Sequence, residues 1–306
     1  MTSDVVIVGA GPAGVSAALW ARSLDLVPEV LEAAASPGGQ LHIVHFHPLN
    51  FAGVADGDGA AIAGVLAKQL GDARIDVRGG SPATALEGGS EARPPRVITA
   101  DGVAHEGGAV LVASGARRRR LEVPGERELE GRGVSYSATH DRAMLAGRRV
   151  VVVGGGNAAF ENALLLSGAG CAVTLVVRDQ PRARHEFVQR VAQDPRIEVL
   201  EGASVSGIRG GDRVGAVAIE SAGRHFERPA EGVVVKVGMI PNTEWCAGAL
   251  DLDPGGYVRV EATLRSSRPR VWAAGDVTRP VVPSLAVAIG QGAQAMGAIR
   301  AVLRPD

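Results

Sequence analysis

Two glycine-rich segments, about half a chain apart, limit the possible folds more than any other feature. Residues 9–14 read Gly-Ala-Gly-Pro-Ala-Gly, and residues 154–159 read Gly-Gly-Gly-Asn-Ala-Ala. Each segment follows an apolar run typical of a buried strand and opens a helix of small residues. A strand, a glycine turn and a helix in this order bind the pyrophosphate of a dinucleotide. Two such units in 306 residues predict one protein that holds two dinucleotides.

The composition is typical of a globular protein and excludes several other classes. Hydrophobic residues make up 46% of the chain and charged residues 21%, and the length suffices for two domains with their own cores. The net charge of -1 argues against a nucleic-acid-binding protein. No stretch approaches the roughly 18 apolar residues of a membrane span, and no signal peptide precedes the first expected strand. We therefore expect a cytoplasmic protein without a membrane or nucleic-acid partner.

The cysteines and histidines form no pattern typical of a disulfide framework or a metal site. The two cysteines, Cys171 and Cys246, are far apart in the sequence. His42, His45 and His47 lie close together, but they lack helical spacing and an additional carboxylate. No bound metal is therefore expected.

Apolar runs that alternate with helical segments predict the α/β class, with two Rossmann-like, three-layer nucleotide-binding domains. One βαβ unit begins at residues 5–8, and a second begins at residues 149–153 after the pattern resets near Gly125. Past Pro241 the sequence returns to the first domain. We expect the second domain to be inserted into the first, with residues 1–117 and 243–306 in one domain and residues 118–242 in the other.

Within this plan, strands and helices are expected at defined places. The strands are predicted at residues 5–8, 27–31, 75–77, 96–99, 109–113, 149–153, 173–177 and 271–274. The helices are predicted at residues 15–24, 157–166, 185–193 and 285–303.

The first glycine motif carries the residues that a dinucleotide site needs. Gly9 permits the tight turn, Gly11 lets the backbone approach a pyrophosphate, and Gly14 lets the helix pack on the strand. The helix N-terminus offers N–H groups to the phosphates, and one dipole contact contributes about 0.3–1 kcal/mol. Glu32 follows Gly9 by 23 positions, where an acid accepts hydrogen bonds from ribose hydroxyls. The residues expected at this site are Gly9, Gly11, Pro12, Ala13, Gly14 and Glu32.

The second glycine motif has the same turn but a different ribose end. In the first motif, Glu32 lies 23 positions after Gly9. The residue 23 positions after Gly154 is Val177, which is not an acid, and Arg178 follows it. Loss of the acid and gain of an arginine favour a 2′-phosphate, and therefore NADPH over NADH. Asp179 would repel that phosphate unless it is turned away. The residues expected at this site are Gly154, Gly156, Asn157, Ala158, Arg178 and Arg184.

Further segments resemble the low-molecular-weight thioredoxin reductases, which have the class II pyridine nucleotide-disulfide oxidoreductase fold. Residues 37–41 (Pro-Gly-Gly-Gln-Leu) look like their flavin-contacting loop, and residues 50–53 (Asn-Phe-Ala-Gly) look like their Asn-x-Pro-Gly motif, with Ala52 replacing proline. Residues 113–116 and 274–277 are similar to two later motifs in the same order. The resemblance implies a homodimer with FAD in the first domain and NADPH, or NADH, in the second. It implies FAD contacts from Gly39, Gln40, Leu41, Asn50, Gly115, Gly275, Asp276 and Val277.

The redox Cys-x-x-Cys of thioredoxin reductases has no counterpart in this chain. Ser137 and His140 occupy the two cysteine positions in the segment that resembles it. Neither side chain can exchange a disulfide, so the resemblance implies an acceptor other than a disulfide. His140 is a candidate catalytic acid or base because imidazole titrates near neutral pH. His45 is a second candidate, since the related ferredoxin reductases stack an aromatic residue on the flavin at a comparable position.

Three functions remain open at this point. Residues 146–150 (Ala-Gly-Arg-Arg-Val) are similar to a segment of the thioredoxin reductase-like ferredoxin/flavodoxin–NADP reductases. This favours an FAD-dependent NAD(P)H oxidoreductase that reduces a small redox protein such as ferredoxin or flavodoxin, a quinone or another flavin. The second function is a flavin oxidoreductase that acts directly on a small molecule in specialised metabolism. The third is a catalytically silent flavin-binding or redox-sensing module, in which both histidines are ordinary polar residues.

Overall fold

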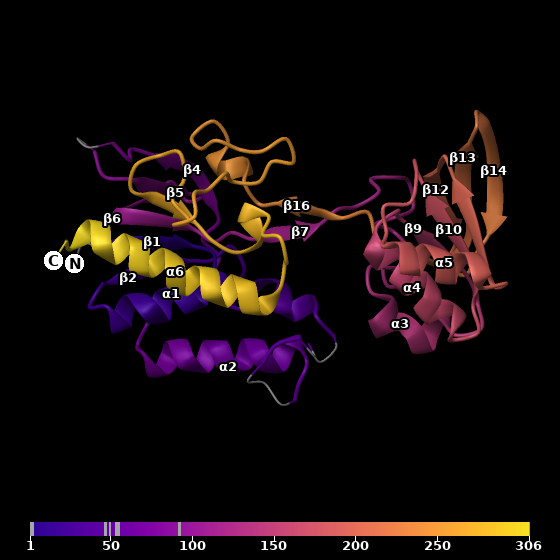
Figure 1. Ribbon diagram of the computed structural model, residues 1–306, viewed down its shortest axis with the longest axis horizontal. Helices are drawn as coiled ribbons and strands as arrows, with labels where there is room; N and C mark the ends of the chain where they lie inside the picture. Colours follow the sequence, from indigo (N-terminus) through magenta and orange to yellow (C-terminus); the bar gives the residue numbers. More distant parts are fainter. Residues whose placement is uncertain (1–2, 46–47, 49, 53–55, 91–92, 306) are drawn as a thin grey trace. The chain divides into compact units, whose positions relative to one another are not determined.

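The computed structural model of the chain describes residues 3–45, 48, 50–52, 56–90 and 93–305 (Figure 1). It divides into two compact units, which we call unit 1 (residues 1–117 and 240–306) and unit 2 (residues 118–239). The return to unit 1 falls at Ile240 rather than at Thr243, because Asn242 is already bound to Ser114. The Ser114 hydroxyl donates to the Asn242 carbonyl at 2.7 Å, and the Asn242 amide donates to the Ser114 carbonyl at 2.8 Å.

Unit 1 is built on a parallel sheet with the strand order β3-β2-β1-β6, in which β17 also pairs with β6. The first residues of β6 pair with an antiparallel strand, β5, which in turn pairs with β4. The strands are β1 (Ser3–Val8), β2 (Pro28–Leu31), β3 (Val77–Arg78), β4 (Ala83–Glu87), β5 (Arg96–Thr99), β6 (Ala104–Val112) and β17 (Val271–Ala273).

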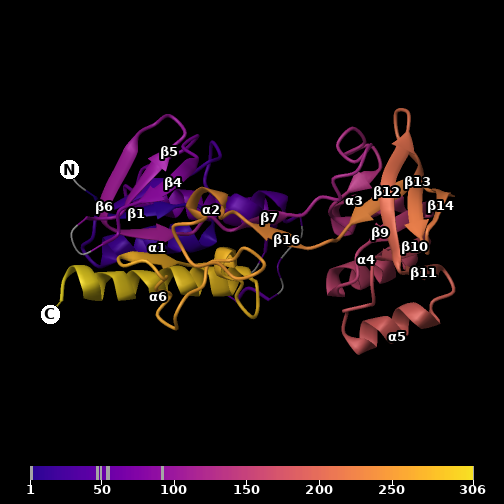
Figure 2. The ribbon, with the colours of Figure 1, turned by 90° about the horizontal axis from the view of Figure 1, so that it is seen from above.

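Three helices accompany this sheet: α1 (Pro12–Ser23), α2 (Gly59–Asp72) and α6 (Leu285–Leu303). Helices α1 and α6 lie side by side, as Figures 1 and 2 show. The Ser16 hydroxyl of α1 donates to the Ile289 carbonyl of α6 at 2.8 Å. A Cβ on Gly292 would lie 2.2 Å from the Ala13 carbonyl oxygen, so glycine is what allows the two backbones to touch. This contact fixes the helix that opens the first glycine motif.

Unit 2 has a parallel sheet with the strand order β11-β10-β9-β15-β8 and a separate antiparallel sheet of β12, β13 and β14. A two-stranded sheet of β7 (Ala116–Arg118) and β16 (Met239–Pro241) forms where the chain leaves and re-enters unit 1. The strands of unit 2 are β8 (Val134–Ser135), β9 (Arg149–Val153), β10 (Ala172–Val177), β11 (Ile197–Glu201), β12 (Ala203–Gly210), β13 (Val214–Ser221), β14 (Arg224–Pro229) and β15 (Gly232–Val235). Its helices are α3 (Ala138–Leu145), α4 (Asn157–Ser167) and α5 (His185–Gln193).

The predicted α/β class is confirmed, because each unit has a parallel sheet whose central strands are buried on both faces. The central strands β1 and β9 are continuous runs of valine and isoleucine with almost no exposed surface after their first residues. Such runs are typical of parallel strands covered by helices on each side. None of the helices in the described ranges is long and apolar enough to cross a membrane.

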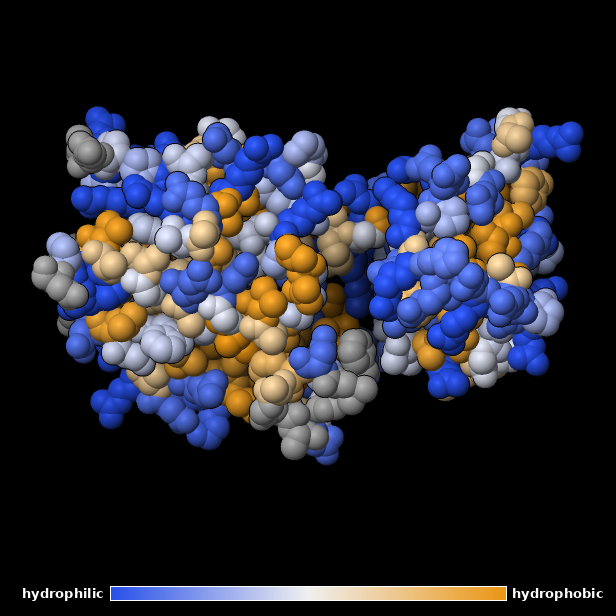
Figure 3. All heavy atoms as spheres, in the orientation of Figure 1, coloured by the Kyte–Doolittle hydropathy of each residue, from blue (hydrophilic) through white to orange (hydrophobic). Residues whose placement is uncertain are grey.

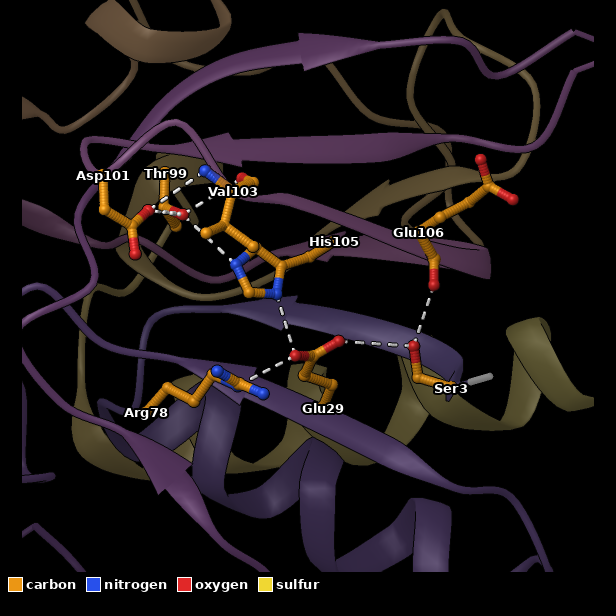
Figure 4. Close-up of polar contacts among 8 residues, drawn as sticks. All are labelled: Ser3, Glu29, Arg78, Thr99, Asp101, Val103, His105 and Glu106. Carbon is orange, nitrogen blue, oxygen red and sulfur yellow. Dashed lines mark hydrogen bonds and ion pairs between the residues drawn. The ribbon is translucent and has the colours of Figure 1, made fainter. Parts of the chain in front are cut away.

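A partly buried polar network lies near the amino ends of β1, β2 and β6 in unit 1 (Figure 4). The ring of His105, which is 6% exposed, lies between Glu29 Oε1 at 2.8 Å and the Thr99 hydroxyl at 3.2 Å. Arg78 pairs with the same Glu29 oxygen at 3.0 Å. The Thr99 hydroxyl and the Val103 N–H lower the pKa of Asp101. This end of the sheet is filled by its own side chains, whereas both glycine motifs lie at carboxyl ends of strands.

Candidate functional site

The first glycine turn follows β1 and requires glycine at two of its three key positions. Gly9 has φ +106°, and a Cβ there would lie 2.4 Å from the Ala113 carbonyl oxygen. A Cβ on Gly14 would lie 1.8 Å from the Gly9 carbonyl oxygen. By contrast, a Cβ on Gly11 would meet no atom within 4 Å. Gly11 therefore borders open space at the N-terminus of α1, where a phosphate can reach the helix N–H groups.

The acid predicted for the first site is held by the backbone around the turn. Glu32 is only 9% exposed. Its Oε2 accepts the Ala10 N–H at 2.6 Å, and its Oε1 accepts the Ala34 N–H at 2.9 Å. Each carboxylate oxygen has a second lone pair, so the carboxylate can still accept hydrogen bonds from two hydroxyls. The turn thus presents a fixed, buried acceptor for a diol.

Three segments that are far apart in the sequence meet at this turn. The Gln40 side chain donates to Asp276 Oδ2 at 2.8 Å across 236 positions. A Cβ on Gly39 would lie 3.1 Å from Gly11 Cα, and a Cβ on Gly275 would lie 2.9 Å from Ala13 Cβ. The short helices η1 (Gly39–Ile43) and η3 (Asp276–Thr278) carry these residues, with Leu41 and Val277 buried beneath them.

Other residues predicted for unit 1 are less closely connected to this cluster. Gly115 has φ +65°, and its carbonyl oxygen accepts the Asn242 N–H at 3.0 Å. Asn50 and His45 are exposed. Gly53 of the second flavin-loop motif and His47 lie outside the described residues. In the ranges that the structure describes, no group of three or more histidine, cysteine or acidic side chains could hold a metal.

The second glycine turn, after β9, is formed differently. Gly154 has φ +143°, and a Cβ there would lie 2.2 Å from the Lys236 carbonyl oxygen. Gly156 borders open space, as Gly11 does in the first turn. The third position is Ala159, whose Cβ is fully buried and would lie 3.1 Å from a Cβ on Gly154. The second turn is therefore wide enough to contain one more methyl group than the first.

The loop after β10 folds back onto this second turn. The Arg182 N–H donates to the Gly155 carbonyl at 2.7 Å, and the Arg184 N–H donates to the Asn157 side chain at 2.8 Å. Arg178 pairs with Asp179 at 3.4 Å, and both side chains are exposed. The loop beside the second turn therefore contains three arginines. Asp179, the acid expected to repel a phosphate, forms an ion pair with one of them, Arg178.

Ser137 and His140 lie at the start of α3 in unit 2. The Ser137 hydroxyl caps the helix by accepting the His140 N–H at 3.4 Å. The His140 ring lies 2.8 Å from Asp141 Oδ1, and its side chain is 54% exposed. Ser137 thus has a structural task. His140 is hydrogen-bonded to a carboxylate in a way that can orient an imidazole.

Both cysteines are buried, and each lies in a different unit. The Cys171 thiol in unit 2 donates to the Leu145 carbonyl at 3.0 Å. Burial raises the pKa of the Cys246 thiol in unit 1 to about 12. A thiol with this pKa supplies almost no thiolate at neutral pH, and the thiolate is the nucleophile in disulfide exchange.

Lys236 was not among the predicted site residues, but it lies beside the second turn. It follows β15, is half-buried, and donates its ammonium to the Tyr136 carbonyl at 2.6 Å. Burial, together with the nearby positive charge of Arg118, lowers the pKa of this amine to about 8. The one signal in the sequence is its rarity, because Lys68 and Lys236 are the only lysines among 32 basic residues.

The two turns, one with a buried acid and one with a group of arginines, each follow a parallel strand and open a helix, which is the local geometry of dinucleotide-binding proteins. A family model described as pyridine nucleotide-disulphide oxidoreductase matches residues 3–292. A thioredoxin reductase from Streptomyces coelicolor is 33% identical over 308 residues, which cover 95% of this chain and 91% of that protein. The chain belongs to the pyridine nucleotide-disulphide oxidoreductase family, whose members use FAD and NAD(P)H.

Two further comparisons agree with this family. One of the subunits of alkyl hydroperoxide reductase from Pseudomonas putida is 35% identical over 300 residues, which cover 95% of this chain but only 56% of that protein. The chain therefore spans little more than half the length of that relative. The crystal structure of Lactococcus lactis thioredoxin reductase in its FR conformation matches with a TM-score of 0.81 and 29% identity, covering 99% of both chains. The predicted thioredoxin reductase-like fold is confirmed.

Proposed function

We propose that unit 1 binds FAD and unit 2 binds NADPH, and that the protein passes electrons from NADPH through FAD to an acceptor that is not a disulfide. The observation that carries the FAD assignment is the hydrogen bond of 2.8 Å between Gln40 and Asp276, which joins two predicted flavin-contacting segments at the first turn. Glu32, with two backbone N–H partners, would hold the adenosine ribose. When bound there, FAD would accept a hydride and release electrons singly or in pairs.

The preference for NADPH rests on the loop after β10. The backbone N–H groups of Arg182 and Arg184 fasten this loop to the second turn. The Arg184 side chain stacks on the Phe187 ring at 4.5 Å, whereas Arg178 directly follows β10, near the place where the adenosine ribose of a dinucleotide lies. No carboxylate takes the place that Glu32 has in unit 1, since Val177 ends the strand. This arrangement would bind a 2′-phosphate through charge-assisted hydrogen bonds.

The chemistry of the cysteines supports an acceptor other than a disulfide. A protein that reduces disulfides through a dithiol needs two thiols that can meet, one of them a thiolate. The two thiols here are buried in different units. We therefore propose a small redox protein such as ferredoxin or flavodoxin, a quinone or a flavin as the acceptor.

A second candidate function is favoured by the pair of His140 and Asp141. The hydrogen bond of 2.8 Å between the ring and the carboxylate would keep one ring nitrogen oriented toward a ligand. In an enzyme that acts directly on a small molecule, His140 would supply or accept the proton that accompanies hydride transfer, and His45 is the alternative candidate.

Rapid mixing without oxygen tests these functions. NADPH should bleach the absorbance of the bound flavin within seconds, and NADH should do so more slowly. Reoxidation by ferredoxin, by a quinone or by free flavin would then assign the acceptor. Rapid reoxidation by thioredoxin disulfide would overturn the proposal, and absence of bleaching by either nucleotide would leave the silent flavin-binding module. Unchanged turnover in a His140→Ala variant would exclude that residue as the proton donor.

We also propose that the protein is a homodimer. Figure 3 shows hydrophobic residues among polar ones on the face of unit 1 that carries α6. Val281 is 101% and Val282 is 59% exposed in the segment just before α6, and a second copy of the chain that covered them would remove this apolar surface from water. Light scattering after gel filtration should give a mass of about twice the 31.3 kDa chain. A Val281→Asp, Val282→Asp double variant should shift that mass toward a monomer.

A further inference from the structure

Lys236 occupies a special place in unit 2, at the point where the order of its parallel strands reverses. Strands β10 and β11 lie on one side of β9, and β15 and β8 lie on the other. The Lys236 N–H donates to the Val153 carbonyl at 2.8 Å, and its own carbonyl oxygen packs against Gly154. Lys236 therefore lines the crevice between β9 and β15. In folds of this kind, dinucleotides lie across the crevice at the reversal point.

The Lys236 side chain points away from the predicted ribose end of the site. Its ammonium donates to the carbonyl of Tyr136, which directly follows β8, at 2.6 Å. Val177 and Arg178 lie at the end of β10, on the opposite side of β9. A nucleotide with its adenosine over β10 and its pyrophosphate at the glycine turn extends its other half over β15 and β8.

The charge of Lys236 is poorly neutralised by its surroundings. Among the described residues, no carboxylate lies within the 4 Å of an ion pair, and Glu161 on α4 attracts the amine from farther away. Arg118 on β7 repels it, and the half-buried position limits screening by water. The pKa of about 8 leaves the amine mostly protonated at pH 7 and mostly neutral above pH 9. Arginine, which supplies 30 of the 32 basic residues, could not lose its charge in this range.

We propose that the Lys236 ammonium lies beside the nicotinamide half of the nucleotide bound to unit 2, where it weakens binding of the oxidised form. The oxidised nicotinamide ring carries a positive charge, and the reduced ring is neutral. A nearby cation therefore repels one form and leaves the other almost unaffected. Lys236 thus selects the reduced nucleotide and speeds release of the oxidised product. This inference rests on the proposed nucleotide site of unit 2 and adds a residue that sets its specificity for the redox state.

Calorimetric titration of the flavin-loaded protein tests the inference without turnover. The probes are NADP+, its 1,4,5,6-tetrahydro analogue, whose neutral ring cannot transfer hydride, and 2′,5′-ADP, which lacks the nicotinamide half. At pH 7, Lys236→Met should tighten NADP+ binding roughly tenfold and leave the other two affinities unchanged. At pH 9.5 the wild-type protein should approach the variant. Lys236→Arg should retain the wild-type preference at both pH values.

The matched control is Lys68→Met, which removes the other lysine, an exposed residue of α2 that pairs with Asp72 at 2.6 Å. It should leave all three affinities unchanged. Equal ratios of NADP+ to analogue affinity in wild type and Lys236→Met would overturn the inference, as would an equal loss of affinity for all three probes. If neither these probes nor their NAD counterparts bind to the wild type, the proposed nucleotide site itself is overturned, and the inference with it.

Discussion

The two glycine turns share one arrangement of strand, turn and helix, but the residues around them differ in burial and in hydrogen bonding. Around the first turn, the acid is buried, glycine is required at the third position, and Gln40 and Asp276 join segments from both ends of the chain. Around the second turn, the third position holds alanine and the charged groups are exposed arginines. The first arrangement suits a cofactor that stays bound, and the second suits a nucleotide that enters and leaves.

The difference follows from what each polar group is bonded to. Glu32 binds two backbone N–H groups and belongs to the folded state of unit 1 whether or not a cofactor is present. Arg178 binds the neighbouring Asp179 at the surface, and an exposed pair of this kind contributes about 0–1 kcal/mol to stability. Loss of the first acid should therefore damage the fold, whereas loss of the arginine should affect the ligand alone.

The largest effect is expected from Gly14→Ala. The new methyl carbon would lie 1.8 Å from the Gly9 carbonyl oxygen, so strand β1 and helix α1 must move apart. We expect a loss of about 3 kcal/mol or more in the free energy of unfolding, because overpacking against backbone cannot be relieved by a side-chain rotation. FAD content after gel filtration, together with the melting temperature, measures the result. A variant that retains stoichiometric FAD would contradict the tight packing of this turn.

A smaller but still large effect is expected from Glu32→Ala. The substitution leaves the buried Ala10 N–H without its partner, and a buried unpaired N–H costs about 1–3 kcal/mol, whereas the N–H of the exposed Ala34 can bond to water. The same substitution removes the acceptor of the ribose hydroxyls, so FAD affinity should fall about a hundredfold. Flavin fluorescence during dialysis measures the release of FAD. Glu32→Gln, which keeps one acceptor oxygen, should lie between the wild type and the alanine variant.

The sequence was sufficient to predict the strands and helices next to each glycine motif. The strands expected at residues 5–8 and 149–153 correspond to β1 (Ser3–Val8) and β9 (Arg149–Val153). The strand expected at residues 75–77 was wrong in part, because β3 covers only Val77–Arg78. Helix α2 and the sheet of β12, β13 and β14 were not predicted. The buried residues Ile62, Leu66 and Leu70 of α2 recur at helical spacing, so the signal for this helix is present in the sequence. The strands β12, β13 and β14 are partly exposed, and their pairing with one another decides their structure.

The site residues could be predicted where they lie close together in the sequence. Spacing alone indicated Gly9, Gly14 and Glu32, because one turn and one strand connect them. The contact between Gln40 and Asp276 spans 236 positions, so only resemblance to known proteins could suggest that both belong to one site. Lys236 gave no motif at all, because its position depends on the pairing of β15 with β9.

The comparison between the turns is sharpened by Arg178→Ala. This substitution should weaken NADPH binding about tenfold and leave NADH binding almost unchanged, because only NADPH carries the 2′-phosphate. The melting temperature should not change, since the Arg178 side chain is 78% exposed. Titration of each nucleotide measures the effect, and Arg190→Ala on α5 is a control for loss of a surface charge. An equal loss of affinity for NADPH and NADH would show that Arg178 does not act by binding the 2′-phosphate.

The smallest effect on nucleotide binding is expected from Ala159→Gly, the substitution that gives the second turn the residue found at Gly14 in the first. Ala159 is fully buried near the start of α4, so glycine removes one packed methyl group and loosens the helix. The combined loss should be about 1–2 kcal/mol, or a few degrees in melting temperature. Nucleotide affinity should not change, because Gly154 and Gly156, which are expected to border the phosphate, are untouched. Thermal unfolding and NADPH titration of the same preparation separate the two quantities. A large loss of NADPH affinity would mean that the Ala159 methyl group holds the second turn at the width that the nucleotide needs. Alanine at this position and glycine at position 14 would then be two ways to pack the same kind of binding turn.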